Sequence, residues 1–98
     1  MAKNIRLTPN MDDETKILIT FLEIAPKSRL KVFKTFKDDE ILRPKQISEI
    51  TNINLNSVGK ALKQLNEKNL VSVLNPNVRA NRNFQLTKKG KDIRKFYS

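Results

Sequence analysis

The chain begins, after residues 1–10, with an acidic segment followed by apolar residues at helical spacing. Residues 12–14 are two aspartates and a glutamate, which suit the start of a helix because the macrodipole favours negative charge there. The apolar stripe that follows is made of Ile17, Leu18, Phe21 and Leu22. The pattern predicts a helix to about Ile24, and then a second helix capped by Ser28, because Pro26 ends one helix or opens the next. Residues 1–10 show no clear period and are expected to form a flexible arm.

A third helix is predicted from Pro44 to about Asn52. Proline suits the first turn of a helix, since its missing N–H would have no partner there anyway. Gln46 occupies the place that a glutamine has in a capping box. Ile47 and Ile50 are expected to face inward, and a short turn follows the helix.

The fourth predicted helix begins after Asn54, a good N-cap, and runs to about Lys68. With a rotation of about 100° per residue, the helix has two unlike sides. The apolar side is formed by Val58, Ala61, Leu62 and Leu65. The opposite side is formed by Asn56, Gly59, Lys60 and Lys63. Leu55 lies between the two sides near the tip, and Asn69 suits the left-handed conformation that often ends a helix.

Beyond this helix the period changes to two, which predicts a β-hairpin. Residues 71–74 and 84–87 are the two expected strands. The linker between them, residues 75–83, is basic, contains no acidic residue and is rich in turn-forming residues. Residues 41–42 are an apolar pair that could form an edge strand.

A last short helix is predicted after Thr87, which can cap it, with Ile93 and Phe96 on its inner side. The whole pattern indicates a single domain over residues 11–98. Its expected class is mainly α with a small β-hairpin, an α+β fold with an extra N-terminal helix and a short C-terminal helix.

The charge is concentrated in the second half of the chain. The formal net charge is +10. Residues 1–42 contain eight Lys/Arg and seven Asp/Glu, whereas residues 43–98 contain twelve Lys/Arg and three Asp/Glu. A basic half beside a nearly neutral half predicts a polyanion-binding face on one part of the fold. The alternative is a generally basic surface that serves solubility.

Two absent residue types exclude several chemistries. The chain has no Cys, which excludes disulfides, thiolate nucleophiles and Cys-ligated metals, and no His, the usual general base. We therefore expect no enzyme activity, no catalytic residues, no cofactor and no metal. The acidic residues 12–14 and 38–40 are interpreted as a helix start and a solvated turn rather than metal ligands. No apolar run approaches the roughly 18 residues of a membrane span, and the N-terminus lacks a signal-peptide core, so a cytoplasmic protein is expected.

The sequence resembles winged-helix DNA-binding regulators of the MarR and ArsR type, in particular small archaeal ones. The resemblance extends over about residues 15–95 and rests on the segment 46–54 and on the apolar residues that follow it. It also rests on three short segments of the chain: Ser28-Arg29-Leu30-Lys31-Val32-Phe33, Leu74-Asn75-Pro76 and Leu86-Thr87-Lys88-Lys89-Gly90. It implies a helix-turn-helix at about 44–68 and a wing at about 71–87. Asn52 stands where the family commonly has Gly, Arg43 where it has Ser or Thr, and the wing lacks Gly.

The resemblance implies double-stranded DNA as the partner, with the fourth helix in the major groove and the wing on the backbone or minor groove. Base or groove contacts are expected from Asn56, Ser57 and Lys60, and phosphate contacts from Lys63, Arg79 and Arg82. Asn54 and Lys45 complete the expected DNA-binding set, although Lys45 could equally be a solvated surface lysine. A further basic run could add backbone contacts, but a solvated helix face is the favoured interpretation. That run comprises Lys88, Lys89, Lys91, Arg94 and Lys95.

A homodimer is expected, because one winged-helix module usually binds a half-site. The expected interface consists of Ile17, Leu18, Phe21, Leu22, Ile93, Phe96 and Tyr97. The alternative is that the N-terminal stripe packs on the protein's own core.

A sequence-specific transcriptional regulator is the leading functional hypothesis. A winged-helix adaptor that binds other proteins is the second, although exposed apolar anchors would suit an adaptor better than a basic face. A replication, viral or plasmid DNA-binding protein is the third, and it would use the same chemistry.

Overall fold

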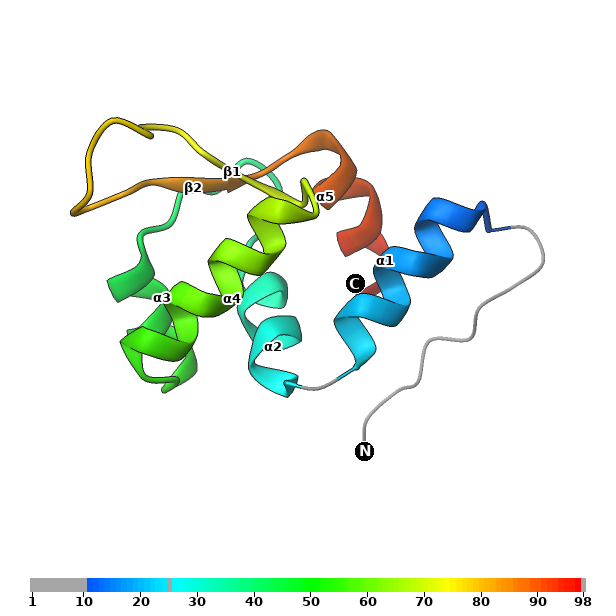
Figure 1. Ribbon diagram of the computed structural model, residues 1–98, viewed down its shortest axis with the longest axis horizontal. Coiled ribbons are helices and arrows are strands. Elements are labelled where there is room, and N and C mark those ends of the chain that lie inside the picture. The colour runs from blue at the N-terminus through cyan, green and yellow to red at the C-terminus, as the bar shows by residue number, and fades with distance from the viewer. Residues whose placement is uncertain (1–10, 25, 98) are drawn as a thin grey trace.

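A computed structural model describes residues 11–24 and 26–97 of this protein (Figure 1). The expected arm at residues 1–10 lies outside the described residues. The described chain is mainly helical, with one small antiparallel sheet, in agreement with the expected α+β class. The elements are, in order, α1 (Asp13–Glu23), α2 (Lys27–Thr35), α3 (Pro44–Thr51), α4 (Leu55–Glu67), β1 (Val71–Val73), β2 (Phe84–Leu86), α5 (Lys88–Arg94) and the short 3-10 helix η1 (Lys95–Tyr97).

Local capping signals set most of the helix starts where the sequence predicts them. The Asp12 carboxylate accepts a hydrogen bond from the Thr15 amide at 2.7 Å. Hydrogen bonding by the Thr15 side chain, and then by its amide, lowers the pKa of Asp12. The Thr87 hydroxyl accepts one from the Gly90 amide at 2.9 Å. The predicted cap of α2 is wrong, because that helix starts at Lys27 and Pro26 is its N-cap. Proline cannot continue a preceding helix, but its carbonyl can accept the first bond of the next one.

The core lies where α2, α3 and α4 meet, with α1 and the hairpin packed against them. Its largest fully buried side chains are Phe33 and Phe36 of α2. The predicted apolar side of α4 is confirmed, since all four of its residues are buried. Ile47 is also buried, but the inward prediction for Ile50 is wrong, because its side chain is 65% exposed. Thr51 takes the inner position one turn after Ile47 and donates a hydrogen bond to the Ile47 carbonyl at 2.7 Å.

The sheet has the predicted hairpin topology, with strands one residue shorter than expected. Val71 pairs with Leu86 and Val73 with Phe84. Leu42 forms a single antiparallel bridge to Phe84 on the other edge of β2, with N–O distances of 2.9 and 2.8 Å. The edge contact predicted for residues 41–42 is therefore confirmed as one bridge.

The end of the chain departs from the expected helix. α5 ends at Arg94 and gives way to the 3-10 helix, which changes the angle between successive side chains. Ile93 is buried as predicted, but Phe96 is 42% exposed, so the inward prediction for Phe96 is wrong. Tyr97 points inward instead and meets Phe33 edge to face, with ring centroids 6.3 Å apart.

Among the helices of residues 11–24 and 26–97, none is both long and apolar enough to cross a membrane.

Candidate nucleic-acid interface

A tight turn joins α3 to α4 and fixes how α4 begins. Asn52 ends α3 in the left-handed conformation, with φ 63°, which asparagine tolerates better than most residues. The Ser48 hydroxyl donates to the Ile53 carbonyl at 2.6 Å, which holds the turn against α3. The Asn54 side chain then accepts from the Ser57 amide at 2.8 Å and caps α4, as predicted. Asparagine thus takes the left-handed position of the turn, where glycine is otherwise the most common residue.

The outer side of α4 carries the residues that the sequence placed there. Asn56, Gly59, Lys60 and Lys63 are all exposed, opposite the buried side of the helix. A Cβ atom added to Gly59 would find no other atom within 4 Å. Leu55, the first residue of α4, is 52% exposed. This side of α4 is therefore uncovered by the rest of the fold over residues 55–63.

Asn54 and Ser57 contribute less than expected to this outer side. The Asn54 side-chain oxygen is used by the cap, which leaves its amide NH₂ for an outside partner. Ser57 is half-buried and lines a hollow of about 240 Å³ at the edge of the helix. The hollow is also lined by Pro26, Ser28, Lys60, Ala61 and Gln64. Ser57 therefore faces α2 more than it faces the exposed side of α4.

The hairpin loop, residues 74–83, is held by its own side chains. The Asn75 amide donates to the Asn81 carbonyl at 3.1 Å, and the Asn75 oxygen accepts from the Asn83 amide at 2.7 Å. Asn81 has φ 59°, so asparagine supplies the left-handed residue in a loop that lacks glycine. Arg82 Nε donates to the Val78 carbonyl at 2.8 Å. Arg79 is exposed.

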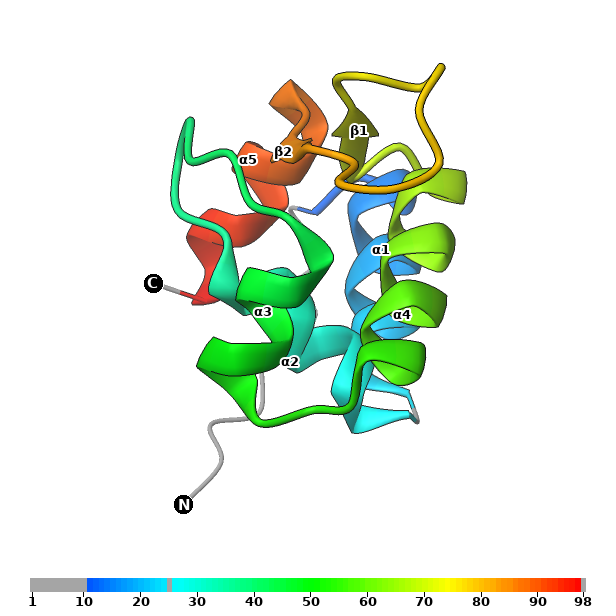
Figure 2. The ribbon, with the colours of Figure 1, turned by 90° about the vertical axis from the view of Figure 1, so that its left-hand side faces the viewer.

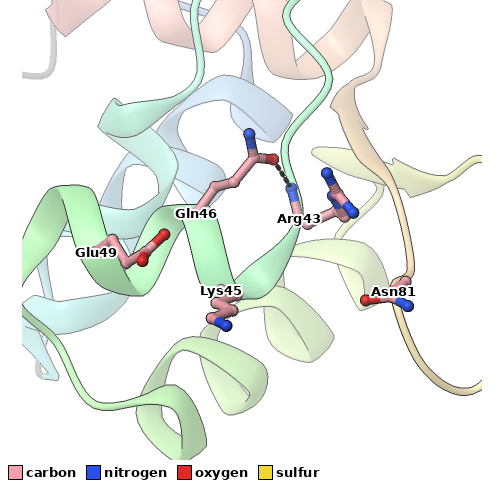
Figure 3. Close-up of a pocket in the computed structure, with 5 residues that line it drawn as sticks. All are labelled: Arg43, Lys45, Gln46, Glu49 and Asn81. Atoms are coloured by element: carbon pink, nitrogen blue, oxygen red, sulfur yellow. Dashed lines mark hydrogen bonds between the residues drawn. The ribbon is translucent and has the colours of Figure 1, made fainter.

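The start of α3 and the hairpin loop line a common cleft of about 360 Å³ (Figure 3). Arg43, Lys45 and Asn81 bring cationic and amide groups to it. Gln46 accepts a hydrogen bond from the Arg43 amide at 2.8 Å, as in a capping box, and Glu49 is the acidic residue of the lining. Sequence reasoning did not include Arg43 among the site residues. Its position directly before the first turn of a helix is the signal that could have identified it.

α3, α4 and the hairpin loop lie on the same side of the molecule, the side that faces the viewer in Figure 2. In Figure 1 they occupy the left of the molecule, whereas α1 lies at the right. The side chains predicted to contact DNA therefore come from elements that share one side of the fold.

The cations of this side differ from those of α5 in their partners. Lys89 forms an ion pair with Glu14 at 2.9 Å, which raises the pKa of Lys89, and Lys91 forms one with Asp39. Arg94 donates to the carbonyls of Phe36 and Lys34. Three members of the basic run after Thr87 thus bind other parts of the fold. By contrast, the five cations of the predicted site form no ion pair with any described residue: Lys45, Lys60, Lys63, Arg79 and Arg82.

Most of the expected dimer stripe belongs to the core. Leu18, Leu22 and Ile93 are at most 5% exposed, so they are not available to a second folded copy. One face of the Phe21 ring is covered by the guanidinium of Arg29, whose Cζ lies 3.8 Å from the ring centroid. The stripe therefore packs mainly on its own core, which was the alternative interpretation.

Tyr97 is also used within the chain. Its hydroxyl donates to Glu23 at 3.0 Å, and its ring packs on Phe33. Burial, and then the bond to Glu23, raise the pKa of Tyr97 above its ordinary value. Of the residues expected at the interface, Ile17 and Phe96 are the large apolar ones that remain exposed, at 62% and 42%.

Arg29 is an interior residue that the sequence did not reveal. It is 7% exposed, donates to the Gln64 side chain at 3.1 Å and to the Phe21 carbonyl, and so connects α2 to both α4 and α1. Its Nε has no hydrogen-bond partner among the described residues, and burial lowers the pKa of Arg29. An arginine in the first turn of a polar helix normally indicates a surface position, so no sequence signal identifies this one.

In the described part of the chain, no three His, Cys, Asp or Glu side chains gather closely enough to hold a metal ion. Comparison with known proteins finds no protein-family model, no curated protein and no solved structure that matches this chain.

Proposed function

We propose that this protein is a winged-helix transcriptional regulator that binds double-stranded DNA in a sequence-specific manner. α4 is the recognition helix and lies in the major groove, and the hairpin loop is the wing that meets the backbone or minor groove. The observation that carries the proposal is that exposed cations on α3, α4 and the hairpin loop lack carboxylate partners within the described chain, whereas three of the four cations of α5 bind a carboxylate or a backbone carbonyl. Side chains left unpaired on one side of a basic protein are available to phosphates.

The side chains have distinct roles in this proposal. Asn56 is exposed on the outer side of α4 and can bond bidentately to adenine, and Lys60 can contact guanine or a phosphate. The remaining predicted cations contact phosphates, which fixes the register of the protein on the duplex. They are Lys45, Lys63, Arg79 and Arg82. The Arg82 bond to its own loop uses only Nε, so both terminal nitrogens remain for a phosphate.

The proposal is tested by selecting bound sequences from random duplex DNA at two salt concentrations. A defined preferred sequence is expected, with an affinity that falls steeply as the salt rises. Lys63→Ala should weaken binding to all duplexes alike and reduce the slope of log K against log salt by about 1. Asn56→Ala should instead change which sequence is preferred.

Lys16→Ala is the matched control, because Lys16 lies on α1 at the other end of the molecule (Figure 1). Its affinity and salt dependence should equal those of the unmodified protein. If neither Lys63→Ala nor Asn56→Ala changes DNA binding, α4 is not the recognition helix.

A further inference from the structure

The outer side of α4 begins with an apolar residue between polar neighbours. Leu55 is the first residue of the helix, lies between Asn54 and Asn56, and is 52% exposed. It belongs to no part of the buried core. An apolar side chain held in water at this point gains free energy when a ligand covers it.

Gly59 extends the exposed apolar surface of Leu55 along the helix. It stands four residues after Leu55, so the two residues lie one above the other on the same face of α4. Because nothing lies within 4 Å of a Cβ at Gly59, this part of the face is flat. Leu55 and Gly59 thus form a low apolar strip, and Asn56 and Lys60, each one residue further along, lie beside it. A flat strip allows the helix backbone to approach a ligand closely.

The major groove offers one apolar group to such a strip, the C5 methyl of thymine. Asn56, the neighbour of Leu55, has the amide that pairs with adenine. We propose that Leu55 contacts the methyl of a thymine while Asn56 bonds to an adenine nearby. The preferred DNA then has A·T base pairs under the start of α4. This inference rests on the proposed function and names what that same face recognises.

Replacement of single thymines by deoxyuridine tests the inference, because it removes the methyl and leaves every hydrogen-bonding group in place. The probe is the duplex obtained by the selection described above, with each thymine replaced in turn. The protein should bind about fourfold more weakly when the contacted thymine is replaced, which is the value of one buried methyl group. Leu55→Ala should bind the two duplexes equally.

Ile24→Ala is the matched control, since Ile24 is an equally exposed apolar residue at the end of α1 and belongs to no predicted contact. It should retain the fourfold difference between thymine and deoxyuridine. Leu55→Ala is expected to fold, because the site is exposed and alanine favours a helix, and its circular dichroism melting curve checks this.

The outcomes separate this inference from the function on which it rests. If the unmodified protein binds its preferred duplex but no deoxyuridine replacement weakens it, the thymine contact is overturned and DNA binding stands. The same holds if Leu55→Ala keeps the fourfold difference. If selection gives binding without any preferred sequence, both the thymine contact and the sequence-specific function are overturned. If the protein binds no duplex at all, both are overturned.

Discussion

Gly59 and Gly90 are the two glycines of the chain, and their surroundings are opposite. A Cβ at Gly90 would collide with the backbone carbonyl of Leu70, so α5 packs directly on the backbone just before β1. A Cβ at Gly59 would point into open space. Neither glycine has a positive φ, so backbone conformation does not explain either of them. What the missing Cβ allows is the close approach of another group to the helix backbone. At Gly90 the approaching group belongs to the protein, and at Gly59 it would belong to a ligand.

Gly59→Ala should therefore stabilise the protein and weaken its binding to DNA. Alanine is favoured over glycine within a helix by up to about 1 kcal/mol, and nothing in the fold opposes the added methyl. On DNA, the same methyl would hold α4 away from the groove. Thermal unfolding and titration with the selected duplex measure the two effects. Unchanged affinity would mean that Gly59 does not lie at the interface.

Gly90→Ala is the contrasting variant. The collision with Leu70 should lower the free energy of unfolding by about 1–3 kcal/mol, as overpacking does elsewhere. Its DNA affinity, measured at a temperature at which the variant is folded, should change little.

The start and end of each element could be predicted from sequence wherever the signal is local. Asn54 and Thr87 cap helices with their own side chains, and Asn69 takes the left-handed conformation at φ 59°. The errors have a different origin. Phe96 lies in the 3-10 helix after α5, where the angle between successive side chains changes, and Ile50 is exposed at the end of α3, where Thr51 takes the inner position. A hydrophobic pattern does not show where a helix changes its geometry.

The contacts between elements could not be predicted, since they join residues far apart in sequence. Arg29 reaches Gln64, 35 residues away, and Arg94 reaches Lys34, 60 residues away. The same limit applies to the candidate site. The outer side of α4 follows from helical spacing, whereas the cleft between Arg43 and the hairpin loop requires the fold.

Arg29→Met tests how much the interior arginine stabilises the packing of α1, α2 and α4. Methionine keeps the length and the apolar stem but leaves the Phe21 carbonyl and the Gln64 oxygen without their donor. We expect a loss of about 1–3 kcal/mol in the free energy of unfolding, measured by urea denaturation. Lys31→Met, at an exposed position of the same helix, should stay within about 0.5 kcal/mol of the unmodified protein. Equal stability of the two variants would show that Arg29 adds nothing to the packing.

The hydrogen bond from Tyr97 of η1 to Glu23 of α1 should make the stability of the protein depend on alkaline pH. Because its pKa is raised on folding, the folded protein holds the phenol proton more firmly than the unfolded chain does. This contribution is complete below the ordinary tyrosine pKa of about 10 and is lost as the pH rises above it. The free energy of unfolding should therefore fall less steeply above pH 10 in Tyr97→Phe than in the unmodified protein. Parallel curves would contradict the assignment.

At the scale of the whole molecule, the proposed function favours a two-fold dimer, because one recognition helix covers only a half-site. Light scattering at micromolar concentration should give twice the mass of one chain. Ile17 is exposed on α1, so Ile17→Glu should reduce the mass to that of a monomer. Ile50→Glu, at an equally exposed isoleucine of α3, should leave the dimer intact. A monomeric mass for the unmodified protein would remove the homodimer from the proposal.

The separation of charge along the molecule has a kinetic consequence. Residues 11–24 contain four carboxylates and one lysine, whereas residues 43–87 contain seven Lys/Arg and two glutamates. These two segments extend toward opposite ends of the longest axis (Figure 1). Residues 88–97, which contact α1 through the Lys89–Glu14 ion pair, add five Lys/Arg and one aspartate, so the net charge is about +1 at the α1 end and +5 over residues 43–87. A polyanion would rotate such a molecule during approach and turn α1 away before any contact forms. The rate of productive encounter should then fall with ionic strength, because screening removes the torque as well as the attraction.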